Sequence, residues 1–214
     1  MHLITSEHEL WRKSLRDCPF PEPWWAFLWP GGFALTRWCA DHPHLVQGRH
    51  VIDFASGCGS SAIQAAKAGA NVSANDIDPN AAAAVSLNAS ANGCSASLNG
   101  ASITAVRGAG RTVALDLRDI VGMSRRQLLD VEVLLAGDVM YEDELARRVT
   151  DWLLRLSLEG CVVLVGDPGR HFLDKARLEQ IGSYPLPPEL RDENYGLSEG
   201  GVWTVKTPRR PRAG

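Results

Sequence analysis

Val51-Ile52-Asp53-Phe54-Ala55-Ser56-Gly57-Cys58-Gly59 is the stretch of sequence that decides the fold. Its first half is mostly apolar without polar alternation, which is typical of a strand buried on both faces. Gly57 and Gly59 then allow a sharp turn into an Ala-rich helix, which we expect over 60–68 and which Gly69 ends. Doubly wound α/β sheets bind ligands at such a turn, beyond the carboxyl ends of their strands.

The pattern of strand, loop and helix repeats along the chain. We expect further strands at 71–75, 113–117, 131–136, 161–166 and 200–205. Asp78-Pro79 predicts the start of a helix to about residue 88, and another helix is expected over 142–156. Such alternation predicts an α/β fold with a doubly wound, mostly parallel sheet. The Gly-, Ser- and Ala-rich stretch 93–111 is interpreted as a loop.

The residues before the first strand have a different character. Ser6-Glu7-His8-Glu9 resembles a capping box and predicts a helix through Leu15. Three prolines between 19 and 23 predict an extended segment, and another helix is expected over 33–39. We therefore divide the chain into N-terminal helices with a Trp-rich lid (1–45), the main domain (46–207) and a flexible basic tail (208–214).

Composition places the chain among ordinary globular proteins. It has 214 residues, 45% of them hydrophobic, with a net charge of −3 and a pI of about 6.1. This charge makes nucleic acid a weak candidate for a partner, and no apolar stretch approaches the length of a membrane span. Five cysteines without a Cys-x-x-Cys pair, and no signal peptide, favour a reducing compartment. We expect a cytoplasmic monomer.

Two acids accompany the glycine loop. Asp76 ends the second strand, 19 residues after Gly57, where a carboxylate can accept hydrogen bonds from both hydroxyls of a ribose. Asp53 lies within the first strand's end. The pattern predicts an adenosine pocket, and its alternative is a tight turn beside a helix-capping acid.

The adenosine could belong to a dinucleotide or to S-adenosylmethionine, because Gly57-x-Gly59-x-x-Ala62 also satisfies the dinucleotide fingerprint. Three features favour the methyl donor. The anionic Asp53 would repel a pyrophosphate but could bind the amino group of methionine. About 50 residues precede the first strand, and Gly137-Asp138-Val139-Met140-Tyr141 places an acid and an aromatic ring after the fourth strand.

Six segments together carry a family resemblance: Trp24–Leu35, Ser56–Gly59, Ala74–Pro79, Leu87-Asn88, Gly137–Asp143 and Gly166–Arg170. In this order they resemble the lysine methyltransferases that modify the β-subunit of electron transfer flavoprotein. These enzymes are a branch of the class I, seven-strand methyltransferases. The resemblance implies a seven-stranded Rossmann-like sheet with an antiparallel C-terminal strand, S-adenosylmethionine as the cofactor and protein lysine as the acceptor.

Matching by position also assigns residues. Asp138 and Tyr141 match an Asp-x-x-Tyr motif that lies beside the acceptor lysine, which makes them the candidate catalytic residues. The positions implied for cofactor binding are Trp29, Gly31, Asp53, Ser56, Gly57, Gly59, Asp76 and Asp116. Ala55 stands where the family usually has glycine.

Several residues have plainer alternatives. Trp24, Trp25 and Trp29 could form a cation cage or a hydrophobic lid, and Asp138 could merely cap the next helix. The segment 166–169 could be a tight turn or line the acceptor cleft. The six histidines have no ligand spacing, so no metal is assigned. Alternative functions are a small-amine (nicotinamide-like) N-methyltransferase, an NAD-dependent oxidoreductase and a non-catalytic nucleoside-binding module.

Overall fold

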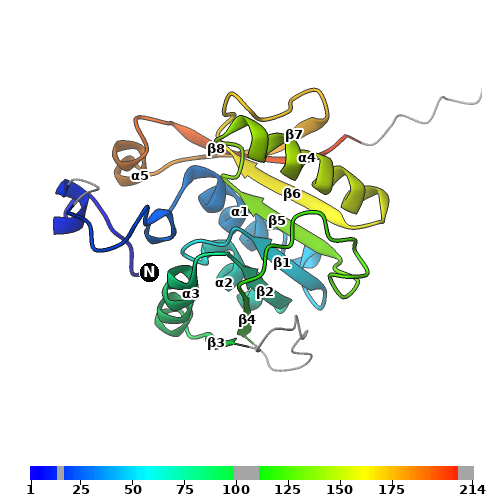
Figure 1. The fold of residues 1–214 in the computed structure, drawn as a ribbon, viewed down its shortest axis with the longest axis horizontal. Helices are drawn as coiled ribbons and strands as arrows, with labels where there is room; N and C mark the ends of the chain where they lie inside the picture. The colour runs from blue at the N-terminus through cyan, green and yellow to red at the C-terminus, as the bar shows by residue number, and fades with distance from the viewer. Residues whose placement is uncertain (14–16, 99–110, 207–214) are drawn as a thin grey trace, which may run out of the picture.

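The computed structural model describes residues 1–13, 17–98 and 111–206, so the tail predicted at 208–214 lies outside the described residues. Within them, one sheet has the strand order β3-β4-β2-β1-β5-β6-β8-β7 (Figure 1). The strands are β1 (His50–Phe54), β2 (Asn71–Asn75), β3 (Ser95–Leu98), β4 (Thr112–Asp116), β5 (Val133–Gly137), β6 (Val162–Asp167), β7 (Leu178–Pro185) and β8 (Glu199–Val205). All pairs from β3 to β6 are parallel, and β8 runs antiparallel to β6 and β7.

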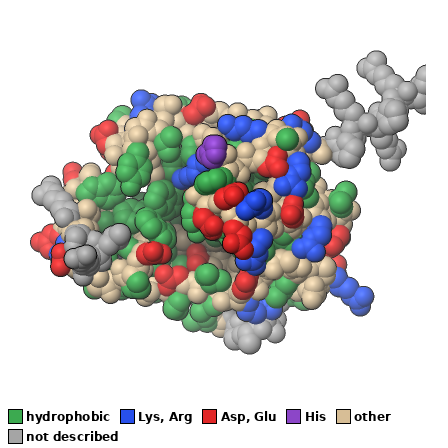
Figure 2. Space-filling view, turned by 45° about the horizontal axis from the view of Figure 1, so that its top comes forward, with side chains coloured by type: hydrophobic (Ala, Val, Ile, Leu, Met, Phe, Trp, Pro, Cys, Tyr) green, Lys and Arg blue, Asp and Glu red, His purple; other side chains and the backbone are tan. Residues whose placement is uncertain are grey.

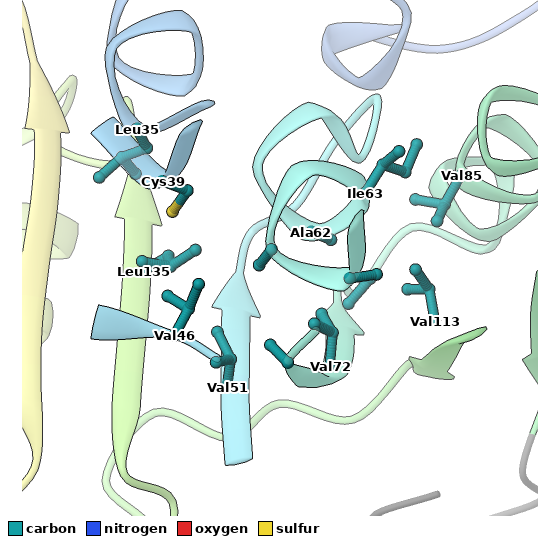
Figure 3. Close-up of a cluster of buried hydrophobic side chains, with 14 of the residues drawn as sticks. Leu35, Cys39, Val46, Val51, Ala62, Ile63, Val72, Val85, Val113 and Leu135 are labelled. Carbon is teal, nitrogen blue, oxygen red and sulfur yellow. The ribbon is translucent and has the colours of Figure 1, made fainter. Parts of the chain in front are cut away.

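The α-helices cover both faces of this sheet. They are α1 (Pro30–Asp41), α2 (Ser60–Lys67), α3 (Pro79–Ala91), α4 (Asp143–Leu158) and the short α5 (Pro188–Glu193). The first three pack on one face, where Leu35, Ile63 and Val85 meet strand residues such as Val51 and Leu135 (Figure 3). The other face is covered by α4 and the connection before β5.

Successive strand residues alternate between these two cores, as the pleat of a strand requires. Val51 and Leu135 belong to the first core, whereas Ile52 and Leu134 belong to the second, and all four are fully buried. Burial on both faces explains why the sequence of β1 shows no polar alternation. The prediction of a doubly wound, mostly parallel sheet is confirmed.

The chain changes direction across the sheet at β1. On one side of β1 lie β2, then β4 and then β3, and the chain afterwards returns to place β5 on the other side. In an open α/β sheet, the loops at such a switch point separate and leave a crevice beyond the strands' carboxyl ends. The loops after β1 and β5 border this crevice.

Two strands differ from the expectations. The sheet has eight strands, whereas the local patterns predicted six and the resemblance implied seven. One of the additional strands is β3 at Ser95–Leu98, inside the stretch interpreted as a loop. Pairing with β4 imposes strand geometry on this short segment at the sheet's edge. The strand β7 was not predicted either, since most of its side chains are exposed and its sequence lacks an apolar pattern.

The N-terminal segment also differs from its prediction. A short 3-10 helix occupies Glu9–Arg12, and His8 caps it by accepting a hydrogen bond from the Leu10 amide, so the predicted capping box at Ser6 is wrong. Two further 3-10 turns lie at Trp24–Ala26 and Pro43–Leu45. The helix α1 is longer than the expected 33–39 and forms part of the core. No helix among the described residues is long and apolar enough to cross a membrane.

Candidate functional site

The loop after β1 has an unusual backbone. Ala55, Gly57 and Gly59 all have positive φ, at 52°, 52° and 78°. The Ser56 amide donates to the Asn75 carbonyl at 2.9 Å, and the Gly59 amide donates to the Ser56 carbonyl at 2.8 Å. Glycine adopts this left-handed conformation without cost, but alanine does not. The departure at Ala55 therefore places strain in the loop.

Asp76 lies directly beside this loop. Its Oδ2 accepts a hydrogen bond from the Gly57 amide at 2.9 Å, and its Oδ1 accepts one from the Asp78 amide at 3.0 Å. Burial raises the pKa of Asp76 above its ordinary value, although these amides act to lower it. Each carboxylate oxygen can accept more than one hydrogen bond, so both retain capacity for ligand hydroxyls.

Asp53 is almost fully buried, with 1% of its surface exposed. Its oxygens accept hydrogen bonds from the Ser61 hydroxyl at 2.8 Å and from the Ala62 amide at 3.0 Å. Burial raises its pKa to about 7 in spite of these bonds. The carboxylate thus occupies the first turn of α2, where a dinucleotide enzyme would bind pyrophosphate.

Asp138 follows β5 and has a positive φ of 58°. Its side chain is 8% exposed, its Oδ2 accepts from the Gly32 amide at 2.8 Å, and its Oδ1 binds the Arg170 guanidinium. Burial raises the pKa of Asp138 to about 6, while Arg170 and the Gly32 amide both oppose this rise. An amide in the first turn of α1 thus finds its hydrogen-bond acceptor in a residue 106 positions away. Glu142, and not Asp138, caps α4.

Aromatic side chains border the same region. The Trp29 ring nitrogen donates to the Trp24 carbonyl at 2.9 Å, and the two ring centroids lie 5.9 Å apart. Phe27 packs against Trp29 at 5.7 Å, whereas Trp25 packs against Phe20. Trp24 and Trp29, but not Trp25, thus form one aromatic wall.

Tyr141 stands three residues beyond Asp138 and is 62% exposed. Desolvation raises the pKa of its phenol, and the nearby carboxylates of Glu142, Glu22 and Asp76 raise it further. The phenol is therefore protonated at neutral pH and available as a hydrogen-bond donor. Its exposure gives a ligand access from the surface.

These elements enclose one cavity among the described residues. Its lining comes from the Trp-rich segment, α1 and the loops after β1 and β5: Phe27, Leu28, Trp29, Gly32, Asp53, Ala55, Ser56, Gly57, Cys58, Ser60, Ser61, Gly137 and Asp138. The Ser56 hydroxyl oxygen is buried there without a hydrogen-bond partner. Figure 2 shows a hollow in the surface where hydrophobic side chains gather and acidic side chains lie along the border.

Four of the residues implied at the cofactor are not among those that line this cavity: Gly31, Gly59, Asp76 and Asp116. Gly31 does not line the cavity; it packs against Gly166 of β6, where a Cβ would overlap the Gly166 carbonyl oxygen. Its neighbour Gly32 lines the cavity instead. The Asp116 carboxylate is buried, and Arg118 binds it with two hydrogen bonds of 2.9 and 3.1 Å. The Asp116 carbonyl accepts from the Asp76 amide, which places Asp116 beside the pocket wall.

Sequence reasoning missed three residues of this site. Ser61 binds Asp53, Gly32 binds Asp138, and Arg170 forms the ion pair with Asp138. For Arg170 there was a signal, because Gly166-Asp167-Pro168-Gly169-Arg170 carried part of the family resemblance and 166–169 was interpreted as a tight turn or as lining of the acceptor cleft. Cys58 is buried, and burial raises the pKa of its thiol to about 11.

The chain is similar in sequence to proteins of known activity. The chain is 34% identical to the electron transfer flavoprotein beta subunit lysine methyltransferase of Xenopus laevis, over 96% of this chain and 78% of the relative. The protein of the same name from Rattus norvegicus is 36% identical, over 95% and 74% of the two chains. No model of a protein family matches.

Solved structures have the same fold. The magnesium protoporphyrin IX methyltransferase of Synechocystis PCC 6803, solved with S-adenosylmethionine, superposes with a TM-score of 0.52. The superposition covers 82% of this chain and 78% of that one, and the sequences are 14% identical. At this identity the likeness concerns the fold alone.

Proposed function

The chain belongs to the family of electron transfer flavoprotein β-subunit lysine methyltransferases, and from this premise we propose that it methylates protein lysine with S-adenosylmethionine as the methyl donor. The β-subunit of electron transfer flavoprotein is the proposed substrate. One observation carries the proposal best: a single cavity joins the glycine loop, beside which Asp76 lies, to Asp138. We propose further that the enzyme is a cytoplasmic monomer.

The residues present fit the proposed cofactor. The unpartnered hydroxyl of Ser56 and the open backbone at Gly57 offer polar contacts and close approach, since a Cβ at Gly57 would meet only the Trp25 Cα, at 3.6 Å. Asp76 would bind the ribose hydroxyls, and Asp53 would favour the cationic end of methionine by its charge. When bound, S-adenosylmethionine supplies a methyl group on a positively charged sulfur.

The protein's own task is to position the acceptor amine and to remove its proton. A lysine amine has an ordinary pKa of about 10.4, so it must lose a proton before its lone pair can form the new C–N bond. Entry between Trp29 and Tyr141 would exclude water and lower the pKa of that amine. Asp138, ionised above pH 6, accepts the amine's hydrogens and orients its lone pair toward the methyl carbon.

The two enzymatic alternatives are less well supported. In a dinucleotide enzyme the first turn of α2 must be free for pyrophosphate, but here the Ala62 amide already donates to Asp53, whose pKa of about 7 leaves it partly ionised at neutral pH. A small-amine enzyme would benefit from a closed pocket, whereas Trp24 and Tyr141 are 50% and 62% exposed. An open aromatic mouth suits a side chain that arrives on a polypeptide.

The test supplies labelled S-adenosylmethionine to the purified enzyme, with purified electron transfer flavoprotein in one reaction and nicotinamide in another. We expect label on lysine of the β-subunit and none on nicotinamide. Asp138→Ala should abolish most transfer. The matched control is Asp143→Ala, which removes an exposed acid that pairs with Arg147 and should leave transfer unchanged. Label confined to the small molecule would overturn the proposed substrate.

A further inference from the structure

The segment Gly166–Arg170 forms a turn that close backbone packing and hydrogen bonds hold in place. Gly166 faces the Gly31 carbonyl, where a Cβ would overlap it, and Gly169 has a φ of +93°. Asp167 is fully buried, and its Oδ1 accepts hydrogen bonds from the amides of Gly169 and Arg170, both at 2.7 Å. The turn therefore reverses the chain directly after β6 and returns Arg170 toward the cavity.

Arg170 lies between two buried acids. Its Nη1 binds Oδ1 of Asp138 and lies 3.4 Å from Oδ2 of Asp167. The Arg170 side chain is 21% exposed, against 8% for Asp138 and none for Asp167. A guanidinium in this place compensates the charge of both acids, which burial would otherwise make costly.

The Asp138 carboxylate is thereby fixed from two sides. Arg170 binds one of its oxygens, and the Gly32 amide at the start of α1 binds the other at 2.8 Å. The backbone of Asp138 is left-handed, so its side chain leaves β5 in a direction that only surrounding contacts maintain. Arg170 is the only side chain among the described residues that forms a hydrogen bond with this carboxylate.

We propose that Arg170 is a positioning residue for methyl transfer, which holds the Asp138 carboxylate against the acceptor amine. The proposal rests on the proposed function, because it concerns the same site. Without Arg170 the carboxylate would keep only the hydrogen bond from the Gly32 amide and would lose the counter-charge of the guanidinium. A misplacement of about 1 Å in a reacting group can lower a rate about a hundredfold.

Arg170 also affects the pH at which Asp138 is ionised. Burial and Asp167 both raise the pKa of Asp138, while Arg170 and the Gly32 amide lower it, with a result of about 6. Asp167 from β6 and Arg170 from the following turn are the charged groups that face it, and α1 contributes only main-chain N–H. Removal of Arg170 therefore raises the pKa of Asp138 further, and the enzyme needs a higher pH to become active.

The test compares Arg170→Met, Arg170→Lys and the control Arg177→Met. Arg177 likewise bridges two acids, Asp174 and Asp151, but outside the site. At pH 7 we expect Arg170→Met to lower kcat at least about tenfold and to move the acid limb of the kcat profile upward by about one pH unit or more. Arg170→Lys, which keeps the charge, should recover part of both, and Arg177→Met should resemble the wild type.

Two further measurements separate positioning from a structural role. The affinity for S-adenosylhomocysteine should stay within about threefold in Arg170→Met, and adding Arg170→Met to Asp138→Asn should cause little further loss, as expected for residues that act together. An unmoved acid limb, or parallel loss of kcat and cofactor affinity, would overturn the inference. Absence of transfer in the wild type would instead refute the proposed function.

Discussion

The replacement Asp53→Asn tests how the site retains a buried acid. The asparagine oxygen can accept from the Ala62 amide, and its NH₂ group can donate to the Ser61 hydroxyl, so the variant resembles the protonated acid. We expect Asp53→Asn to make the protein more stable than the wild type at pH 8. We expect no such gain at pH 4.

The magnitude follows from the pKa of Asp53, which burial raises from the ordinary value of 3.8 to about 7. Between these values the folded state retains a proton that the unfolded state has lost, so the free energy of unfolding falls as the pH rises. Each pH unit corresponds to about 1.4 kcal/mol, which gives a cost on the order of 4 kcal/mol above pH 7. The variant does not have this cost.

The assay is urea unfolding of both proteins at several values between pH 4 and pH 8. Asp174→Asn is the control with the opposite sign: burial acts to raise the pKa of Asp174, but its bonds to Arg177 lower it, so ionised Asp174 is stabilising. Equal pH dependence of Asp53→Asn and wild type, or a less stable variant at pH 8, would refute the reasoning.

Three other substitutions test the surroundings of the site. Gly166→Ala should lower the free energy of unfolding by about 2–3 kcal/mol, because a Cβ would overlap the Gly31 carbonyl; an unchanged urea midpoint would contradict this packing. Ala55→Gly should cost less than about 0.5 kcal/mol or stabilise, since it relieves a positive φ, and a loss above 1 kcal/mol in thermal unfolding would argue against strain. Asn88→Ala should destabilise by about 1–3 kcal/mol and weaken S-adenosylhomocysteine binding, because the buried Asn88 side-chain amide donates to the Cys58 carbonyl at 2.9 Å. Undiminished affinity in a calorimetric titration would show that Asn88 does not support the cofactor loop.

The central part of the fold could be predicted from local sequence. The strand Asn71–Asn75 has the predicted bounds, and Asp78 caps α3 by accepting from the Asn80 amide at 2.8 Å. Apolar runs between turn residues give a strong local signal when a strand is buried on both faces. Edge strands give a weaker one, and Leu178–Pro185, which is mostly exposed and paired only with β8, was missed.

The site was predictable as a set of residue types but not as a set of contacts. The glycine loop and Asp76 are close in sequence, and the structure confirms that they meet. The partners of Asp138 could not be inferred, since Gly32 and Arg170 lie 106 and 32 residues away and meet it only through the sheet topology. The same long-range packing brings Gly31 of α1 against β6 and its neighbour Gly32 to the cavity.

The most direct measurement for the cofactor site is calorimetric titration with S-adenosylhomocysteine and, separately, NAD. We expect one molecule of S-adenosylhomocysteine to bind the wild type and NAD not to bind. Asp76→Ala should weaken that binding about 10- to 100-fold through the loss of charge-assisted hydrogen bonds to the ribose. Asp78→Ala, which removes only the cap of α3, should preserve it. Binding of NAD with similar affinity, or full S-adenosylhomocysteine affinity in Asp76→Ala, would contradict the proposed site.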